Sequence, residues 1–562
     1  MTIIKPNQGS VIGSDAYSNH TELTEIEIED GVTVIGPSAF DGCTSLTRVT
    51  IPPSVKAIRF HAFKGCTSLT SITIPDSVTD IADAAFEGCP LLSHVIVAGR
   101  LVCWNNASGD IAIPAGVTEI ANNAFAECTD LTGVAFPPSV TKIGSRAFSG
   151  CTGLASIVIP DQVTEIDEYA FSHCTGLTKV VLPSGLKDIK PNTFYGCTAL
   201  SSVVIPASVE KIGNDAFYGC TALNSINIPN GVQEIGIWAF TGCTALVRVS
   251  LPDSLIRIGD RAFERCPVLR DINIPDSVTE IGDAAFEGCK RLPRIIVGDR
   301  LVSWSDATGD VVIPKGITAI QESAFFECTG LTSVTIPDSV TEIGSSAFHG
   351  CTNLAKVTIP DSVEDIYECA FWGCRLLPQM VHDDMLLCWN DAVGDITLPQ
   401  GIPYILDGAF ALCTTLTGVT IPDGVIGIGD LTFYGCTGLT TVNMPKSMEY
   451  IGSSAFYGCT SLTKVVIPSG VTAIECFAFQ GCSSLASVSI PDSVTEIEAE
   501  TFEGCTSLTD ITIPDSVTHI WSRAFAHCPK LAKVTIPDKA LVFEDSFDAH
   551  TVVVRRKAGA GN

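Results

Sequence analysis

The 562-residue chain is poor in basic residues and has no long apolar run. Its 33 lysines and arginines are outnumbered by 62 aspartates and glutamates, which gives a formal net charge of −29. Such a surface repels phosphate backbones and anionic lipid heads, so nucleic acid is not an expected partner. No stretch approaches the roughly 18 consecutive apolar residues of a transmembrane helix, although 46% of the residues are hydrophobic. The apolar residues therefore predict a core and no membrane insertion.

The sequence also lacks the short motifs that carry catalysis or metal binding. It contains no Gly-x-Ser-x-Gly, His-Glu-x-x-His or Gly-x-x-x-x-Gly-Lys pattern and no Cys-x-x-Cys pair. The nine histidines fall at unrelated positions of the sequence pattern. We therefore expect a protein that is not an enzyme and that has no cofactor and no metal site.

What the sequence does have is a repeat built around the dipeptide Ala-Phe. Of the 20 intervals between successive repeat phenylalanines, 16 are 23 residues long, three are 39 and one is 22. These phenylalanines are Phe40, Phe63, Phe86, Phe125, Phe148, Phe171, Phe194, Phe217, Phe240, Phe263, Phe286, Phe325, Phe348, Phe371, Phe410, Phe433, Phe456, Phe479, Phe502, Phe525 and Phe547. The fixed spacing predicts a single array of 23-residue modules over residues 1–547.

The residues of each module predict the same local structures in the same order. Alternating apolar residues at 331–336 indicate a strand with one buried face, and Pro337 ends that strand. A second short extended segment follows at 340–343. Gly344–Phe348 is predicted to form a single helical turn that carries Phe348 into the core. One module cannot bury its apolar face alone, so stacked modules must share a continuous core.

This pattern resembles the BspA-type, or treponemal-type, leucine-rich repeat. The shared positions are the spaced Cys, Leu, Ile/Val, Ile/Leu-Pro, Val, Ile-Gly and Ala-Phe residues, and the resemblance covers nearly the whole chain. It implies a β-rich repeat solenoid: a curved right-handed leucine-rich-repeat superhelix with a concave parallel sheet and short helical turns. The family is commonly associated with surface adhesion and protein binding, so the resemblance implies a non-catalytic binding scaffold.

The three 39-residue intervals each gain 16 residues of one kind, at about 98–110, 298–310 and 383–395. Each insertion reads as a turn, a strand that ends in tryptophan, and a second turn. The simplest structure is an antiparallel strand beside the module's own strand, which makes three hairpin insertions. We expect Trp104, Trp304 and Trp389 to pack these hairpins onto the sheet, with an exposed recognition element as the alternative.

Both ends of the chain follow from the register of the repeat. Tyr17 lies 23 residues before Phe40, so the array is expected to start at the first residue, with no room for a signal peptide. A cytoplasmic location is the expectation for the sequence as written, and the cell surface or secretion if the N-terminus is incomplete. Residues 548–562 are predicted as a terminal strand and a disordered tail.

Cysteine recurs once per module. Of 24 cysteines, 20 lie three residues after a repeat phenylalanine, and the exceptions are Cys103, Cys369, Cys388 and Cys476. This spacing predicts a buried column of reduced thiols, each a small apolar residue with a weak S–H donor. A disulfide between stacked modules is not excluded by geometry.

Two ligand-related alternatives are weaker. In ten modules an aspartate follows the strand-ending proline, which favours an Asx turn over a calcium ligand, since one carboxylate per turn supplies too few oxygens. An enzyme that cleaves acidic polysaccharides is a remote alternative. Such a site needs clustered carboxylates and bases on one sheet face, and Asp271 is accompanied at most by Arg248.

Two rows of residues are candidates for partner contact. Three successive modules place an apolar residue on the outward face of the sheet, beside a lysine, and three others place a ring directly after the repeat phenylalanine. These residues are Val158, Val181 and Val204 with Lys179, and Phe326, His349 and Trp372. We expect the second row to be exposed, where it either contacts a partner or shields the hairpin of Trp389. The expected partner is an unknown protein or surface glycan, the chain is expected to be a monomer, and an intracellular structural scaffold is the alternative function.

Overall fold

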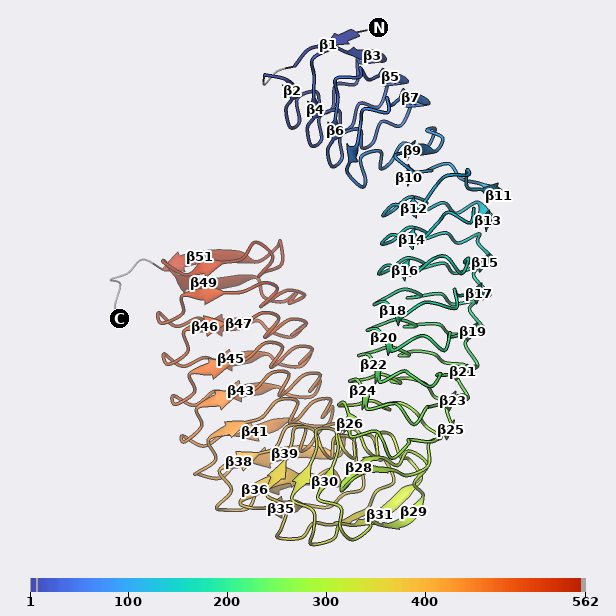
Figure 1. Ribbon diagram of the computed structural model, residues 1–562. Coiled ribbons are helices and arrows are strands. Elements are labelled where there is room, and N and C mark those ends of the chain that lie inside the picture. Colours follow the sequence, from blue (N-terminus) through green and yellow to red (C-terminus); the bar gives the residue numbers. More distant parts are fainter. Residues whose placement is uncertain (1, 7–8, 557–562) are drawn as a thin grey trace. The chain divides into compact units, whose positions relative to one another are not determined.

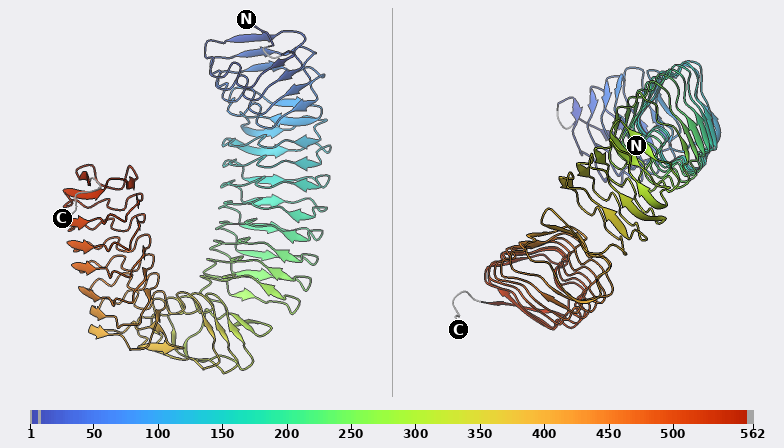
Figure 2. Two further views of the ribbon diagram at one scale, coloured as in Figure 1. Left: turned by 90° about the vertical axis from the view of Figure 1, so that its left-hand side faces the viewer. Right: turned by 90° about the horizontal axis from the view of Figure 1, so that it is seen from below.

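The computed structural model of this chain describes residues 2–6 and 9–556 and consists of two compact units, Met1–Leu292 and Pro293–Asn562 (Figure 1). Within each unit, the chain winds through successive turns, or rungs, whose strands lie side by side with those of the next rung (Figure 2). In nearly all complete rungs, a strand of three to five residues joins a first column and a two-residue strand joins a second column. The parallel β-solenoid predicted from the repeat is confirmed.

In the N-terminal unit, strands of one column pair in parallel with a 23-residue offset, as in Ser156↔Lys179↔Ser202. The first column contains β1 (Thr2–Ile4), β3 (Glu25–Ile28), β5 (Arg48–Thr50), β7 (Ser71–Thr73), β11 (Gly109–Ala112), β13 (Leu131–Ala135), β15 (Ser156–Val158), β17 (Lys179–Val181), β19 (Ser202–Val204), β21 (Ser225–Asn227), β23 (Arg248–Ser250) and β25 (Asp271–Ile272). The second contains β2 (Val11–Ile12), β4 (Val34–Ile35), β6 (Ala57–Ile58), β8 (Asp80–Ile81), β10 (Arg100–Cys103), β12 (Glu119–Ile120), β14 (Lys142–Ile143), β16 (Glu165–Ile166), β18 (Asp188–Ile189), β20 (Lys211–Ile212), β22 (Glu234–Ile235), β24 (Arg257–Ile258) and β26 (Glu280–Ile281).

The C-terminal unit repeats this arrangement. Its first column contains β29 (Gly309–Val312), β31 (Leu331–Thr335), β33 (Lys356–Thr358), β37 (Gly394–Thr397), β39 (Leu416–Thr420), β41 (Thr441–Asn443), β43 (Lys464–Val466), β45 (Ser487–Ser489), β47 (Asp510–Thr512), β49 (Lys533–Pro537) and β51 (Val552–Arg556). Its second column contains β28 (Arg300–Ser303), β30 (Ala319–Ile320), β32 (Glu342–Ile343), β34 (Asp365–Ile366), β36 (Met385–Cys388), β38 (Tyr404–Ile405), β40 (Gly427–Ile428), β42 (Tyr450–Ile451), β44 (Ala473–Ile474), β46 (Glu496–Ile497), β48 (His519–Ile520) and β50 (Leu541–Val542). The predicted terminal strand is β51, and residues 557–562 of the predicted tail lie outside the described residues.

The predicted helical turn is wrong, because the described residues contain no helix. Two residues before Phe348, Ser346 has a φ of 55°, and two residues after it, Gly350 has a φ of 70°. Left-handed residues on both sides of the phenylalanine stop a right-handed helix. The segment instead bonds to the next rung: the amide of Phe348 donates to the carbonyl of Ala370 at 2.8 Å, and that of Gly350 to the carbonyl of Trp372 at 2.7 Å.

The repeat phenylalanines and cysteines form the core of each rung. In the N-terminal unit, Phe217, Phe240 and Phe263 are fully buried, and their rings stack at centroid distances of 5.2 Å and 5.2 Å. The carbonyl of Phe217 accepts two hydrogen bonds, from the amide of Cys220 at 3.2 Å and from the thiol of Cys243 in the next rung at 3.3 Å. The thiol column therefore satisfies a row of buried carbonyl groups.

The insertions contain the predicted antiparallel pairs, β9 (Val95–Val97) with β10, β27 (Ile295–Val297) with β28, and β35 (Met380–His382) with β36. The second strand of each hairpin also pairs in parallel within the second column, as β10 does with β12. After β10 the chain passes through Trp104 directly to β11, which joins the first column beside β13. Each insertion is therefore a shortened rung that lacks the phenylalanine-containing turn.

Candidate functional site

The valine stripe, defined as Val158, Val181 and Val204, lies on the outward face of β15, β17 and β19. Parallel pairing places the three valines directly beside one another. Their exposed fractions are 64%, 40% and 80%. Alternate residues of the same strands point into the core, so these valines face away from it. Lys179, two residues before Val181, is exposed on the same face, as the sequence predicts.

The aromatic row of Phe326, His349 and Trp372 is half-buried, whereas the sequence predicts an exposed row. The ring of Phe326 stacks on His349 at a centroid distance of 4.8 Å, and His349 meets Trp372 edge to face at 4.2 Å. Burial lowers the pKa of His349 to about 4, and the charge of Glu327 offsets this only in part. His349 is therefore neutral at pH 7, and its ring contributes as an apolar surface.

Trp372 extends this row across the shortened rung of the third insertion. Its Cδ1 atom lies 2.6 Å from the position that a Cβ atom on Gly408 would occupy. On the far side, its ring meets Tyr434 at a centroid distance of 6.1 Å, and Tyr434 stacks on Tyr457 at 4.9 Å. The Nε1 atom of Trp372 is buried and has no hydrogen-bond partner among the described residues. The indole therefore fills a space beside the missing turn.

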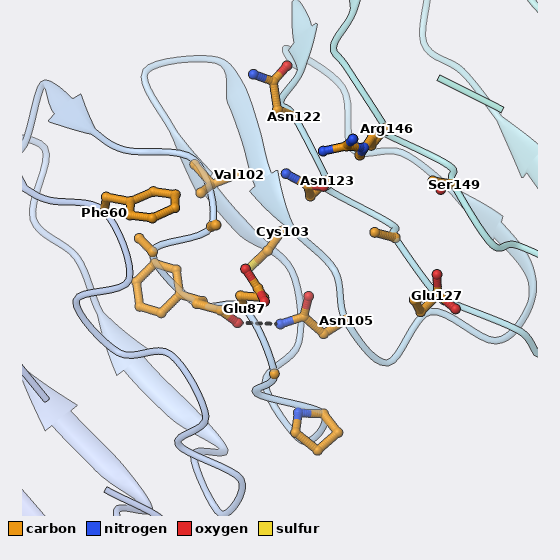
Figure 3. Close-up of a pocket in the computed structure, with 16 residues that line it drawn as sticks. Phe60, Glu87, Val102, Cys103, Asn105, Asn122, Asn123, Glu127, Arg146 and Ser149 are labelled. Carbon is orange, nitrogen blue, oxygen red and sulfur yellow. Dashed lines mark hydrogen bonds between the residues drawn. The ribbon is translucent and has the colours of Figure 1, made fainter. Parts of the chain in front are cut away.

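At the first insertion no tryptophan fills the corresponding space, because residue 87 is a glutamate. A cavity of about 680 Å³, which we call the lateral notch, is lined by Phe60, Phe86, Val102, Asn105, Asn123 and Arg146, among other residues. Figure 3 shows Phe60 on one side of the notch and Asn123, Arg146 and Glu127 on the other, with Asn105 between them. The floor is apolar and the rim carries amides and charges, which is typical of ligand pockets, whose volumes are about 300–1,000 Å³.

The shortened rung explains why the notch exists. In a complete rung, the amide of Phe63 donates to the carbonyl of Ala85 and the amide of Gly65 to that of Glu87, both at 2.8 Å. In the part of the chain that the structure describes, the equivalent amides of Phe86 and Gly88 have no acceptor. Asn105 replaces the missing thiol, since its Nδ2 atom donates to the carbonyl of Phe86 at 2.7 Å.

The charges at the rim come from both flanking rungs. Glu87 pairs with Nζ of Lys64 at 3.1 Å and with Nε2 of His61 at 3.2 Å. Burial raises the pKa of Glu87, but the interactions with Lys64 and His61 lower it more, so that it lies below its ordinary value. On the opposite side, the guanidinium of Arg146 lies 4.7 Å from the centre of the Tyr169 ring. The rim therefore offers both a carboxylate and a cation at neutral pH.

Sequence reasoning missed the lateral notch. The available signal was the residue that follows the repeat phenylalanine at each insertion, Glu87 at the first and Trp372 at the third. The insertion tryptophans Trp104, Trp304 and Trp389 are half-buried. Their rings contact the next repeat phenylalanine at centroid distances of 5.9, 5.9 and 6.2 Å.

Other ligand chemistry finds little support in the described residues. Among them, no group of three or more His, Cys, Asp or Glu side chains could hold a metal ion. Arg248 and Asp271 pair with each other, with Nε and Oδ2 2.5 Å apart. All 24 cysteines are free, and 22 of them are buried. A search of the described residues for a helix long and apolar enough to cross a membrane finds none.

Comparison with known proteins points to one repeat family. The profile of the BspA type leucine-rich repeat region matches the chain in six copies, over residues 10–107, 102–224, 210–308, 296–387, 386–483 and 472–551. None of the curated proteins matches the chain.

Several solved structures are similar to this chain. A leucine-rich cell surface protein from Faecalibacterium prausnitzii is 29% identical, with 62% of this chain and 92% of that chain covered and a TM-score of 0.46. The T. pallidum leucine-rich repeat protein is 31% identical, with coverage of 36% and 87% and a TM-score of 0.30. The pneumococcal vaccine antigen PcpA is 16% identical, with coverage of 83% and 96% and a TM-score of 0.32.

Proposed function

Because this chain belongs to the BspA-type leucine-rich repeat family, we propose that it is a non-catalytic recognition scaffold that binds a protein partner. The contact surface is the outward face of the first strand column in the N-terminal unit. Repeated rungs supply a regular face of small polar residues there, and binding depends on the few positions that depart from the repeat.

The observation that carries this proposal is the exposure of the valine stripe. The three adjacent valine side chains are 40% to 80% exposed, and a partner that covers them would remove this apolar surface from water. Ser156 and Ser202 flank Lys179 in neighbouring strands, so the apolar stripe has a polar edge. An apolar centre with a polar rim is the usual composition of a protein interface. Lys179 adds a cation, which favours a partner with an acidic group at that place.

The aromatic row is the weaker contact candidate. Phe326, His349 and Trp372 already bury much of their area against one another. A partner would gain less from covering half-buried rings than from covering the valine stripe. We therefore assign this row a packing role in the C-terminal unit.

The first prediction tests the valine stripe. Val181→Lys places a second charge at its centre and should reduce partner binding at least tenfold, because this lysine loses its hydration against apolar surface while the partner's acidic group is already paired with Lys179. The measurement is chemical cross-linking of the full chain to its native partner, followed by titration of the purified partner onto wild type and variant.

The matched control is Val466→Lys on β43. Val466 is 56% exposed at the same strand position, but its neighbour in the next strand is Ser489, so it stands outside any apolar stripe. This variant should bind as wild type does. Equal partner affinity for Val181→Lys and wild type would refute the valine stripe as the contact surface.

A further inference from the structure

The two units contain the same notch in two states. Relative to the repeat, Glu87 occupies the position of Trp372, Asn123 that of Gly408, and Ser149 that of Tyr434. Asn123 and Ser149 line the lateral notch. Their counterparts Gly408 and Tyr434 are the residues against which the indole of Trp372 lies. The C-terminal unit therefore fills with its own tryptophan the place that the N-terminal unit leaves open.

The open notch also presents unused backbone groups. Among the described residues, the amides of Phe86 and Gly88 have no acceptor, and the carbonyl of Ala126 has no donor. All three residues line the lateral notch. Backbone groups at the border of a shortened rung can bond to water, but they can also bond to an incoming peptide group. An occupant that carries amide groups next to an aromatic ring matches both features.

We propose that the lateral notch binds an aromatic residue of a partner polypeptide, with the ring where Trp372 lies in the C-terminal unit. The partner's backbone carbonyl accepts from the amides of Phe86 and Gly88. This socket rests on the proposed recognition function and deepens it, since it names an anchoring residue for the partner. Aromatic side chains in pockets are frequent anchors of protein interfaces, because they bury about 150–250 Å² with few rotatable bonds.

The rim suits an aromatic residue within a chain better than a free charged molecule. Glu87 stands at one side and Arg146 at the other, so neither an anion nor a cation is favoured throughout. Phe60 and Phe86 supply the apolar side that contacts the ring.

The test uses N-acetyl-tryptophanamide as the probe and the full chain as the receptor. Saturation-transfer NMR should show binding of this probe, and N-acetyl-alaninamide should give no signal. The double variant Glu87→Trp with Asn123→Gly copies the pair Trp372 and Gly408, so it should fill the notch and reduce probe binding at least tenfold. Asn123 has a φ of 58°, so glycine fits its backbone without strain.

Two matched variants control this experiment. Asn123→Gly alone leaves the notch open and should bind the probe. Asp41→Trp makes the same acid-to-tryptophan change after Phe40, where the hydrogen bonds of the turn to the next rung are complete, and it should also bind the probe. The proposal is overturned if wild type does not bind the probe, if the alanine compound binds equally well, or if the double variant binds like wild type. Val181→Lys should leave probe binding intact, so a failure of the valine stripe remains distinct from a failure of the socket.

Discussion

At the scale of single residues, the cysteine thiols donate hydrogen bonds to buried carbonyl groups that would otherwise need water or a polar side chain as a donor. In most rungs, the carbonyl of the repeat phenylalanine lies in the core and accepts from one backbone amide of its own rung, as Phe217 does from Cys220. A second lone pair remains, and the thiol of the next rung takes it. Cysteine is small enough to stack at every rung and still donates, whereas alanine would leave the carbonyl with one partner.

The buried thiols give a prediction about chemical reactivity. Burial raises the pKa of Cys243 to about 12, and the reactive species is the thiolate. At pH 8, an aromatic disulfide reagent should therefore react within minutes only with Cys476, because burial also raises the pKa of Cys369, the other cysteine that is not fully buried, to about 12. The remainder should react once denaturant is added. Cys476→Ser should remove one fast equivalent, and fast reaction of most of the 24 thiols without denaturant would contradict the buried column.

At the scale of structural elements, the sequence was sufficient for the strands and insufficient for the turns. Alternation and the strand-ending proline located β31 and its equivalents, because a half-buried strand leaves a period-two signature. The turn around Phe348 was misjudged as helical. The left-handed residue before the phenylalanine is often not glycine, as with Ser346 and Arg146, so composition gave no warning. Its conformation is imposed by hydrogen bonds to the next rung, which a single module does not reveal.

The lateral notch was beyond sequence reasoning for a related reason. The 39-residue intervals predicted a hairpin, and the antiparallel pair of β9 with β10 is present. The sequence did not show which column β10 joins. Because β10 joins the second column, the insertion omits one turn, and among the described residues the amides of Phe86 and Gly88 have no acceptor. The exposure of the aromatic row was misjudged in the same way. Trp372 is half-buried because it packs against Gly408, and the sequence does not show that these two residues are neighbours.

The aromatic row gives a prediction about pH. The pKa of His349 is about 4 in the folded chain, below about 6.5 in the unfolded one, so between these values the unfolded state binds more protons. Stability should therefore fall as the pH drops from 6.5 towards 4 and should be unaffected by this group above 6.5. Allowing for the partial exposure of His349, its protonation should lower the free energy of unfolding by about 1 kcal/mol between pH 7.5 and pH 5.

His349→Phe keeps a ring between Phe326 and Trp372 and removes the titration. The urea midpoint of the full chain should therefore depend less on pH in the variant than in wild type over pH 5 to 7.5. Other titrating groups are common to both proteins, so the difference isolates this histidine. Identical pH dependences would mean that the His349 ring is hydrated in solution.

At the scale of the whole chain, strand pairing and phenylalanine stacking connect each rung to its neighbours. The strand pairs all join adjacent rungs, and the phenylalanine rings stack in the same order, from Phe125 to Phe286 in one run of the N-terminal unit. Stability in such an array is approximately a sum of rung terms and nearest-neighbour terms. A shortened rung interrupts the phenylalanine stack, as between Phe86 and Phe125, where the ring of Trp104 tilts by 33° against Phe125.

This connectivity predicts how the chain responds to a large cavity. Phe240→Ala removes a fully buried ring that contacts Phe217 and Phe263, and it should cost about 3–5 kcal/mol. Because the lost contacts belong to adjacent rungs, hydrogen exchange should accelerate first in residues 217–263, while amides beyond the first insertion, around Phe40 and Phe63, keep their protection. Phe40→Ala is the matched control, with the pattern of protection reversed. An equal loss of protection along the whole chain would mean that the rungs unfold as one cooperative block, and that coupling extends well past nearest neighbours.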